Sequence, residues 1–72
     1  MKEYTIELKG IGTITANIET LKELVSVFNE SAALNRKHSV TSSNDDLAEY
    51  CNNRFEQMAE AATTIEKIIS LN

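Results

Sequence analysis

The spacing of the apolar residues changes once along this chain, and that change constrains the fold more than any other feature. Apolar and polar residues alternate in two short segments, 4–8 and 14–18, which predicts two half-buried strands. From Thr20 onward the apolar residues recur every three or four positions, as they do on one face of a helix. The sequence therefore predicts an α+β fold in one domain, 1–72, with the order strand, strand, short helix, long helix.

The two strands are predicted to form a hairpin over residues 4–18. A three-residue loop, Gly10-Ile11-Gly12, would place Lys9 opposite Thr13 and would keep the apolar residues of both strands on one face. In this register Leu8 faces Ile14. An apolar residue at the tip, Ile11, allows two interpretations: the tip folds back onto the protein, or it contacts a partner.

Two capping signals divide the rest of the chain into helices. Thr20-Leu21-Lys22-Glu23 has the form of a capping box and predicts a first helix over about 20–35. Ser43-Asn44-Asp45-Asp46 predicts a second start, followed by a long helix over about 44–71. Between them, 36–43 is predicted to be a polar connector. The second helix carries an apolar seam of the coiled-coil type. Its members are Leu47, Cys51, Phe55, Met58, Ala62, Ile65 and Ile69.

The long helix has more apolar surface than the short helix can cover. A chain of 72 residues rarely builds a sufficient core alone, so a second copy is one source of the missing burial. The sequence thus predicts a homo-oligomer. Its predicted interface consists of Met58, Ala62, Ile65, Ile68 and Ile69. The alternative is that the apolar face of the hairpin covers this half of the helix and completes the monomer.

Composition disfavours several classes of protein. A formal net charge of −4 is unlike that of proteins that grip nucleic acid or an anionic membrane through a broad basic face. No stretch is apolar enough to span a membrane, and the first residues lack the pattern of a secretory signal. A single cysteine, Cys51, favours a reducing compartment, so we expect a cytoplasmic protein.

Residues suited to catalysis or metal binding are sparse. His38 is the only histidine, and Cys51 lies on the apolar seam, where a thiol is a small hydrophobe rather than a nucleophile. Structural zinc needs about four such ligands. Glu56 and Glu60 stand one turn apart, but a solvated acidic face is the simpler interpretation. The sequence predicts no enzyme, no metal site and no cofactor.

The connector is the one segment with a concentrated chemical character. It joins three consecutive cationic or titratable side chains to hydroxyls at a helix start, a combination that suits a small anion. The candidate ligand-binding residues are Arg36, Lys37, His38, Ser42 and Ser43. Two carboxylates in the following turn, Asp45 and Asp46, oppose an anion there. The alternative is that the cations stabilise the C-terminus of the first helix.

These features lead to two functional hypotheses. The first is a small acidic, non-enzymatic interaction protein, encoded by a phage or a mobile element, that homo-oligomerises and binds or inhibits a larger protein. Its outer, acidic helix surface would comprise Glu49, Asn53, Glu56, Gln57, Glu60 and Thr64. The second is an oligomeric binder that sequesters a small anionic ligand or nucleotide at the 36–43 connector. No motif in the sequence points to a family.

Overall fold

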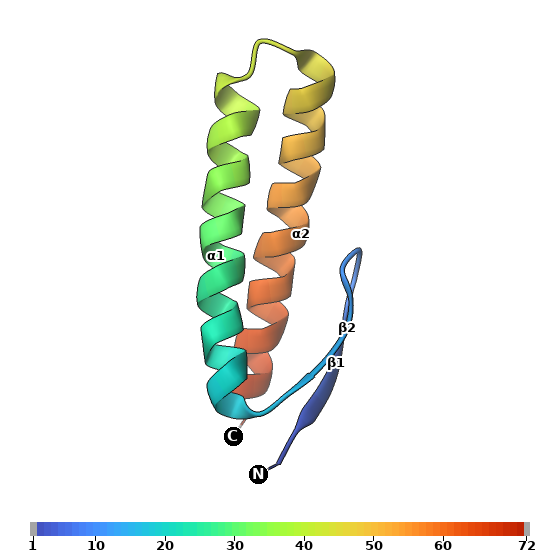
Figure 1. Cartoon of the computed structure of the whole chain (residues 1–72), viewed down its shortest axis with the longest axis vertical. Helices are drawn as coiled ribbons and strands as arrows, with labels where there is room; N and C mark the ends of the chain where they lie inside the picture. The colour runs from blue at the N-terminus through green and yellow to red at the C-terminus, as the bar shows by residue number, and fades with distance from the viewer. Residues whose placement is uncertain (1, 72) are drawn as a thin grey trace.

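The structure, a computed structural model, describes residues 2–71 and confirms the predicted α+β architecture. An antiparallel hairpin of β1 (Tyr4–Leu8) and β2 (Gly12–Ala16) precedes two helices, α1 (Ile18–Thr41) and α2 (Asp45–Ser70). The helices pack side by side in antiparallel orientation, and the hairpin lies beside the C-terminal half of α2 (Figure 1). The molecule is therefore long and narrow, with extents of 47 × 18 × 15 Å.

Helix α1 begins before the predicted capping box. The side chain of Asn17 accepts a hydrogen bond from the backbone N–H of Thr20 at 2.9 Å, so Asn17 is the N-cap. Asparagine is among the best N-cap residues because its oxygen satisfies an amide that has no partner within the helix. As a result Ile18, predicted to end the second strand, is the first residue of α1.

Helix α1 also ends later than predicted, at Thr41 instead of about residue 35. Residues 36–41 contain neither glycine nor proline, and their hydroxyls bond within the helix. Ser39 Oγ donates to the carbonyl of Arg36 and Thr41 Oγ1 to that of Lys37, each at 2.8 Å. The predicted eight-residue connector is thus wrong. Only residues 42–44 join the helices, and Asn44 caps α2 by accepting from the Leu47 N–H at 3.1 Å.

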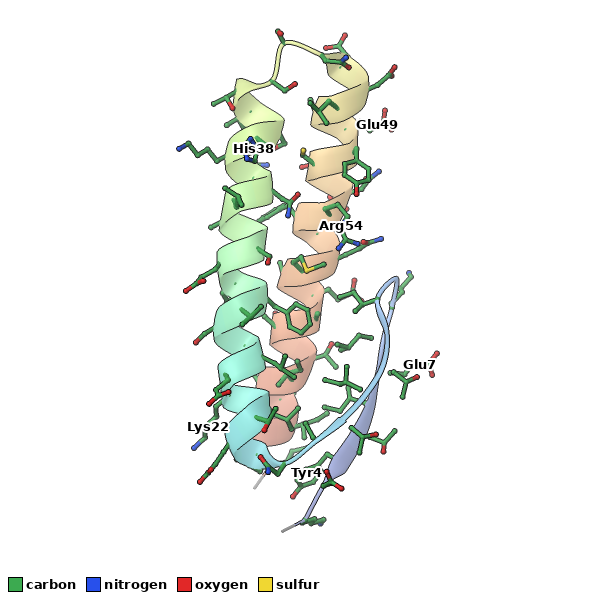
Figure 2. The ribbon with its side chains drawn as sticks, viewed as in Figure 1. Tyr4, Glu7, Lys22, His38, Glu49 and Arg54 are labelled. Carbon is green, nitrogen blue, oxygen red and sulfur yellow. The ribbon has the colours of Figure 1, made fainter. Side chains whose placement is uncertain are left out.

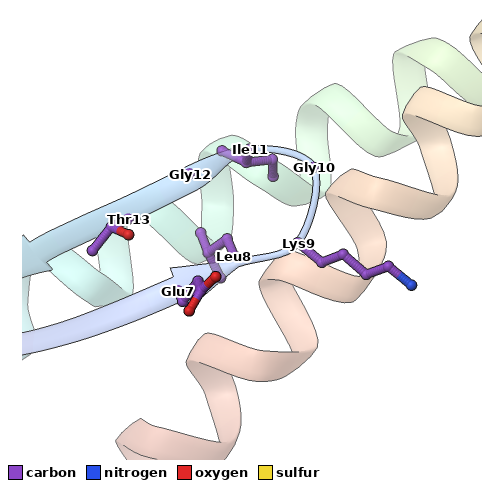
Figure 3. Close-up of a pocket in the computed structure, with 7 residues that line it drawn as sticks. All are labelled: Glu7, Leu8, Lys9, Gly10, Ile11, Gly12 and Thr13. Atoms are coloured by element: carbon purple, nitrogen blue, oxygen red, sulfur yellow. The ribbon is translucent and has the colours of Figure 1, made fainter.

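The hairpin register differs from the prediction by two residues. Leu8 pairs with Gly12 and Ile6 with Ile14, whereas the sequence placed Leu8 opposite Ile14 and Lys9 opposite Thr13. The Ile11 N–H donates to the Leu8 carbonyl at 3.0 Å, and Gly10 has φ +79°. Positive φ at the third residue of a four-residue turn is the signature of a type II turn (Figure 3). A shift of two residues preserves the apolar face, so the faces were predicted correctly.

The turn yields a prediction about Gly10. Gly10→Ala should destabilise the chain by about 1 kcal/mol or more, because the positive φ is strained for any residue with a Cβ. The added Cβ would also lie 2.7 Å from Gln57 Nε2. The same substitution in a Gln57→Ala background removes the collision and leaves the strain. Urea unfolding gives the loss of unfolding free energy caused by Gly10→Ala in the wild-type chain and in the Gln57→Ala chain. The difference between the two losses measures the collision. Equal losses would show that Gln57 plays no part.

The core lies where the hairpin, the start of α1 and the end of α2 meet. Its buried residues are Ile6, Leu8, Ala16, Leu21, Ala61 and Ile65. Leu21 and Ile65 are completely inaccessible to solvent. Ile11, at the hairpin tip, packs against this cluster, so the tip folds back onto the protein, as the first of the two interpretations predicted.

Several residues of the predicted oligomer interface belong to the core of the single chain. Met58, Ala62 and Ile65 are buried within the single chain, while Ile68 and Ile69 are half-buried. The hairpin covers the C-terminal half of α2, which is the alternative left open by the sequence. Met58, Ala62 and Ile65 are therefore core residues of the single chain, and self-association stays a prediction.

The seam between the helices becomes less apolar toward the turn. In this half α1 contributes the half-buried Ser31, Asn35 and Ser39 instead of large apolar side chains. The Asn35 amide donates to the Ser31 carbonyl at 2.8 Å, so its hydrogen bond is local to α1. Leu47, predicted to lie in the seam, is 51% exposed. The half of the helical pair beyond the hairpin is therefore held by less apolar burial than the core.

Candidate functional site

The five residues of the predicted anion site do not converge in one chain. Arg36, Lys37 and His38 are consecutive residues of α1, so their side chains leave the helix about 100° apart. The guanidinium of Arg36 lies over the Phe55 ring, 5.5 Å from its centroid. The Ser42 hydroxyl is used locally, accepting from the Asn44 N–H and lying 3.2 Å from the Asn44 carbonyl. The extension of α1 is what separates these groups.

Removing the two cations should therefore have a small effect. We expect Arg36→Ala with Lys37→Ala to cost about 0.3–1 kcal/mol at the C-terminus of α1. Loss of the Arg36–Phe55 contact should cost about 0.5–1 kcal/mol more. Thermal unfolding with and without inorganic phosphate tests this, with Lys22→Ala as a control cation at the other end of α1. A phosphate-dependent stabilisation that only the double variant loses would restore the anion-site hypothesis.

The remaining chemical candidates lie apart from one another. Cys51 is buried, as the seam predicted, whereas His38 is exposed on α1. Among residues 2–71, no group of three or more histidine, cysteine, aspartate or glutamate side chains is placed to hold a metal ion. No helix within that range is both long and apolar enough to cross a membrane.

Two concave surfaces adjoin the hairpin tip, and a third lies where β1 begins and α1 starts, lined by Lys2, Tyr4, Asn17, Ile18, Glu19 and Lys22. One shallow pocket is formed by residues 7–13 of the tip itself (Figure 3). A second cleft separates the tip from the outer side of α2 and is lined by Lys9, Gly10, Asn53, Glu56, Gln57 and Glu60. Glu56 and Glu60 belong to the predicted acidic surface, so this cleft places Lys9 beside two carboxylates of its own chain.

A larger candidate site lies beyond the hairpin tip. On α2, the side chains of Leu47, Tyr50 and Arg54 continue the helical stripe of Gln57 and Ala61. Gln57 adjoins the hairpin loop and Ala61 belongs to the core that the hairpin covers. The stripe is therefore covered by the hairpin at one end and uncovered at the other.

Helix α1 contributes to the same side of the molecule. Leu34 and His38 lie one helical turn apart on α1, and His38 and Arg54 are both on the viewer's side of the helical pair (Figure 2). We call the surface formed by Leu34, His38, Leu47, Tyr50 and Arg54 the distal face. Its three apolar residues are more than half exposed: Leu34 is 56% exposed, Leu47 51% and Tyr50 61%.

No protein-family model, no curated protein and no solved structure matches this chain.

The charges around the distal face are arranged unevenly. None of its five residues is acidic, although the chain has 11 carboxylate side chains and a net charge of −4. The Arg54 guanidinium donates to Gln57 Oε1 at 2.9 Å, so its charge is directed toward the hairpin end. Glu49, Glu56 and Glu60 are exposed elsewhere on the outer side of α2. The face is flanked by carboxylates, because Glu30 precedes Leu34 and Asp46 precedes Tyr50 by one helical turn.

Sequence reasoning overlooked this face because it followed only the strongest apolar seam. Leu34 and Tyr50 fall outside that seam, and Leu47 was assigned to it. A helical projection of α2 would have shown Leu47 and Tyr50 one turn apart. What it could not show is where the hairpin ends on α2, because that depends on the tertiary packing of the core.

Proposed function

We propose that this chain is a small acidic interaction protein that works by self-association and by binding a larger protein, without catalysing a reaction. The observation that carries the proposal is the distal face, where Leu34, Leu47 and Tyr50 are each more than half exposed. Apolar groups that gather on one surface mark interaction sites more often than scattered ones do. Inhibition of the larger partner would follow if the contact covers a surface that the partner needs.

Charge supports the second part of this proposal. The exposed carboxylates on the outer side of α2 suit a partner with a basic surface and would accelerate its encounter with this chain. They lie on a different side of α2 from Tyr50, so self-association and partner binding would not compete for the same residues.

An affinity capture experiment tests the proposal. The full chain, tagged at one end, is incubated with lysate of its native host, and bound proteins are compared with those held by a Glu49→Lys, Glu56→Lys, Glu60→Lys variant. The proposal expects one larger protein that the wild type retains and the variant loses, and purified partner must then bind in a defined ratio. Equal capture by both chains at low and high salt would contradict the role of the acidic surface.

A further inference from the structure

The turn end of the helical pair contains far fewer buried side chains than the hairpin end. We call residues 33–57 the turn half; it comprises the end of α1, the connector and the first half of α2, and the hairpin tip adjoins it only near Gln57 (Figure 1). Cys51 is the only buried residue between positions 33 and 57. Ala32 and Met58, which are 5% and 6% exposed, lie directly outside this range and mark where tighter packing begins.

Polar contacts do not replace the missing apolar burial between the two helices. Every side-chain hydrogen bond in the turn half stays within one helix and its cap or within the connector, as the Asn35 amide does by donating to the Ser31 carbonyl. The guanidinium of Arg36 does reach the other helix, where it lies over the Phe55 ring. Arg36 is exposed, and a cation–π contact at an exposed site is weak.

The two helical segments of the turn half are also too short to be stable alone. They span nine residues of α1, 33–41, and thirteen residues of α2, 45–57. Isolated helices shorter than about 12–15 residues are marginal in water, so these segments depend on packing against each other. Because that packing is sparse, the turn half is less stable than the core with which it is continuous.

We infer that the turn half opens and closes as a unit of its own while the hairpin and the core stay folded. Leu21 and Ile65, which are inaccessible to solvent in the core, keep their contacts in the open form. Opening uncovers Cys51, which is 7% exposed in the closed form. A partner that binds only one of the two forms would shift this equilibrium, so that local order at the turn would respond to binding.

The single cysteine makes this opening measurable without an added label. A buried thiol is inert toward an aromatic disulfide reagent and reacts with it once the thiol is exposed. We expect Cys51 of the folded chain to react at least about tenfold faster than the global unfolding constant from urea unfolding allows. We also expect a labelling rate that changes little at low urea concentration, because local opening exposes little new surface.

Three variants separate local opening from global unfolding. Asn35→Leu places an apolar side chain in the seam and should slow the labelling of Cys51 about tenfold or more. Asn53→Leu is the matched control, because it makes the same chemical change at an exposed position of the turn half. Ile65→Val lowers the global stability but acts equally on the open and closed forms, so its labelling rate should stay within about twofold of the wild type.

Three outcomes overturn this inference: labelling with the urea dependence of global unfolding, equal rates for Asn35→Leu and Asn53→Leu, or labelling of Ile65→Val that accelerates in proportion to its lost stability. These measurements involve neither a partner protein nor a second copy of the chain. Failure here is therefore independent of failure of the proposed function.

Discussion

Ile65→Asp is expected to unfold the chain rather than to dissociate an assembly. Ile65 is completely inaccessible to solvent and lies in the cluster that joins the hairpin, α1 and α2. A carboxylate there would be desolvated among apolar side chains of the hairpin and both helices. The variant should lose most of its helical circular dichroism at 25 °C, since the total stability of a small domain is about 5–15 kcal/mol.

A milder substitution calibrates this result. Ile65→Ala should leave a folded chain and cost about 2–5 kcal/mol in urea unfolding. Ile69→Ala, at a half-buried position one turn further on, should cost less. If Ile65→Asp instead gave a stable, fully helical monomer, the residue would belong to an interface between copies, as the sequence alone suggested.

The second large effect concerns the attachment of the hairpin. Ile6 and Leu8 are 4% and 3% exposed, and they are the residues of β1 that enter the core. A variant with both replaced by alanine should lose about 4 kcal/mol or more, because each truncation removes apolar contacts and leaves a cavity. The apolar face of α2 at Ala61 would then be exposed. Urea unfolding monitored by circular dichroism gives the loss.

The opposite face of the hairpin provides the control. Thr5 and Thr15 are paired across the strands, with their hydroxyl oxygens 3.1 Å apart, and both are exposed. Replacing both with alanine should cost only about 0.2–1 kcal/mol. Similar losses from the two double variants would mean that the hairpin is stabilised by its own pairing and not by the helices.

The fold class could be predicted from the sequence because periodicity reports which residues are covered. Alternation identified both strands, and the spacing along 47–69 identified the long helix. A two-residue error in register left the faces unchanged, since side chains alternate with a period of two. The error arose from choosing Gly10-Ile11-Gly12 as the loop, when a type II turn needs glycine as its third residue.

The boundaries of α1 were predicted less well because local signals compete there. Asn17 and Thr20 are both good N-caps, and only the tertiary packing of Ile18 decides between them. At the other end, the hydroxyl-rich segment 38–42 is typical of a loop, yet its side chains bond back to the helix. The distal face could not be predicted, because it is defined by the length of α2 that the hairpin leaves uncovered.

The polar seam between the helices has a consequence for the motions of this chain. Near the turn, α1 offers Ser31, Asn35 and Ser39 to its partner helix, while the large buried side chains are gathered at the other end. Stability in a protein is distributed according to such differences in burial, and weakly packed segments open without global unfolding. We therefore expect the turn end to open more readily than the core, which faster amide hydrogen exchange near the turn would show. The exposed side chains of Leu47 and Tyr50 therefore lie in the part of the molecule that we expect to rearrange most readily.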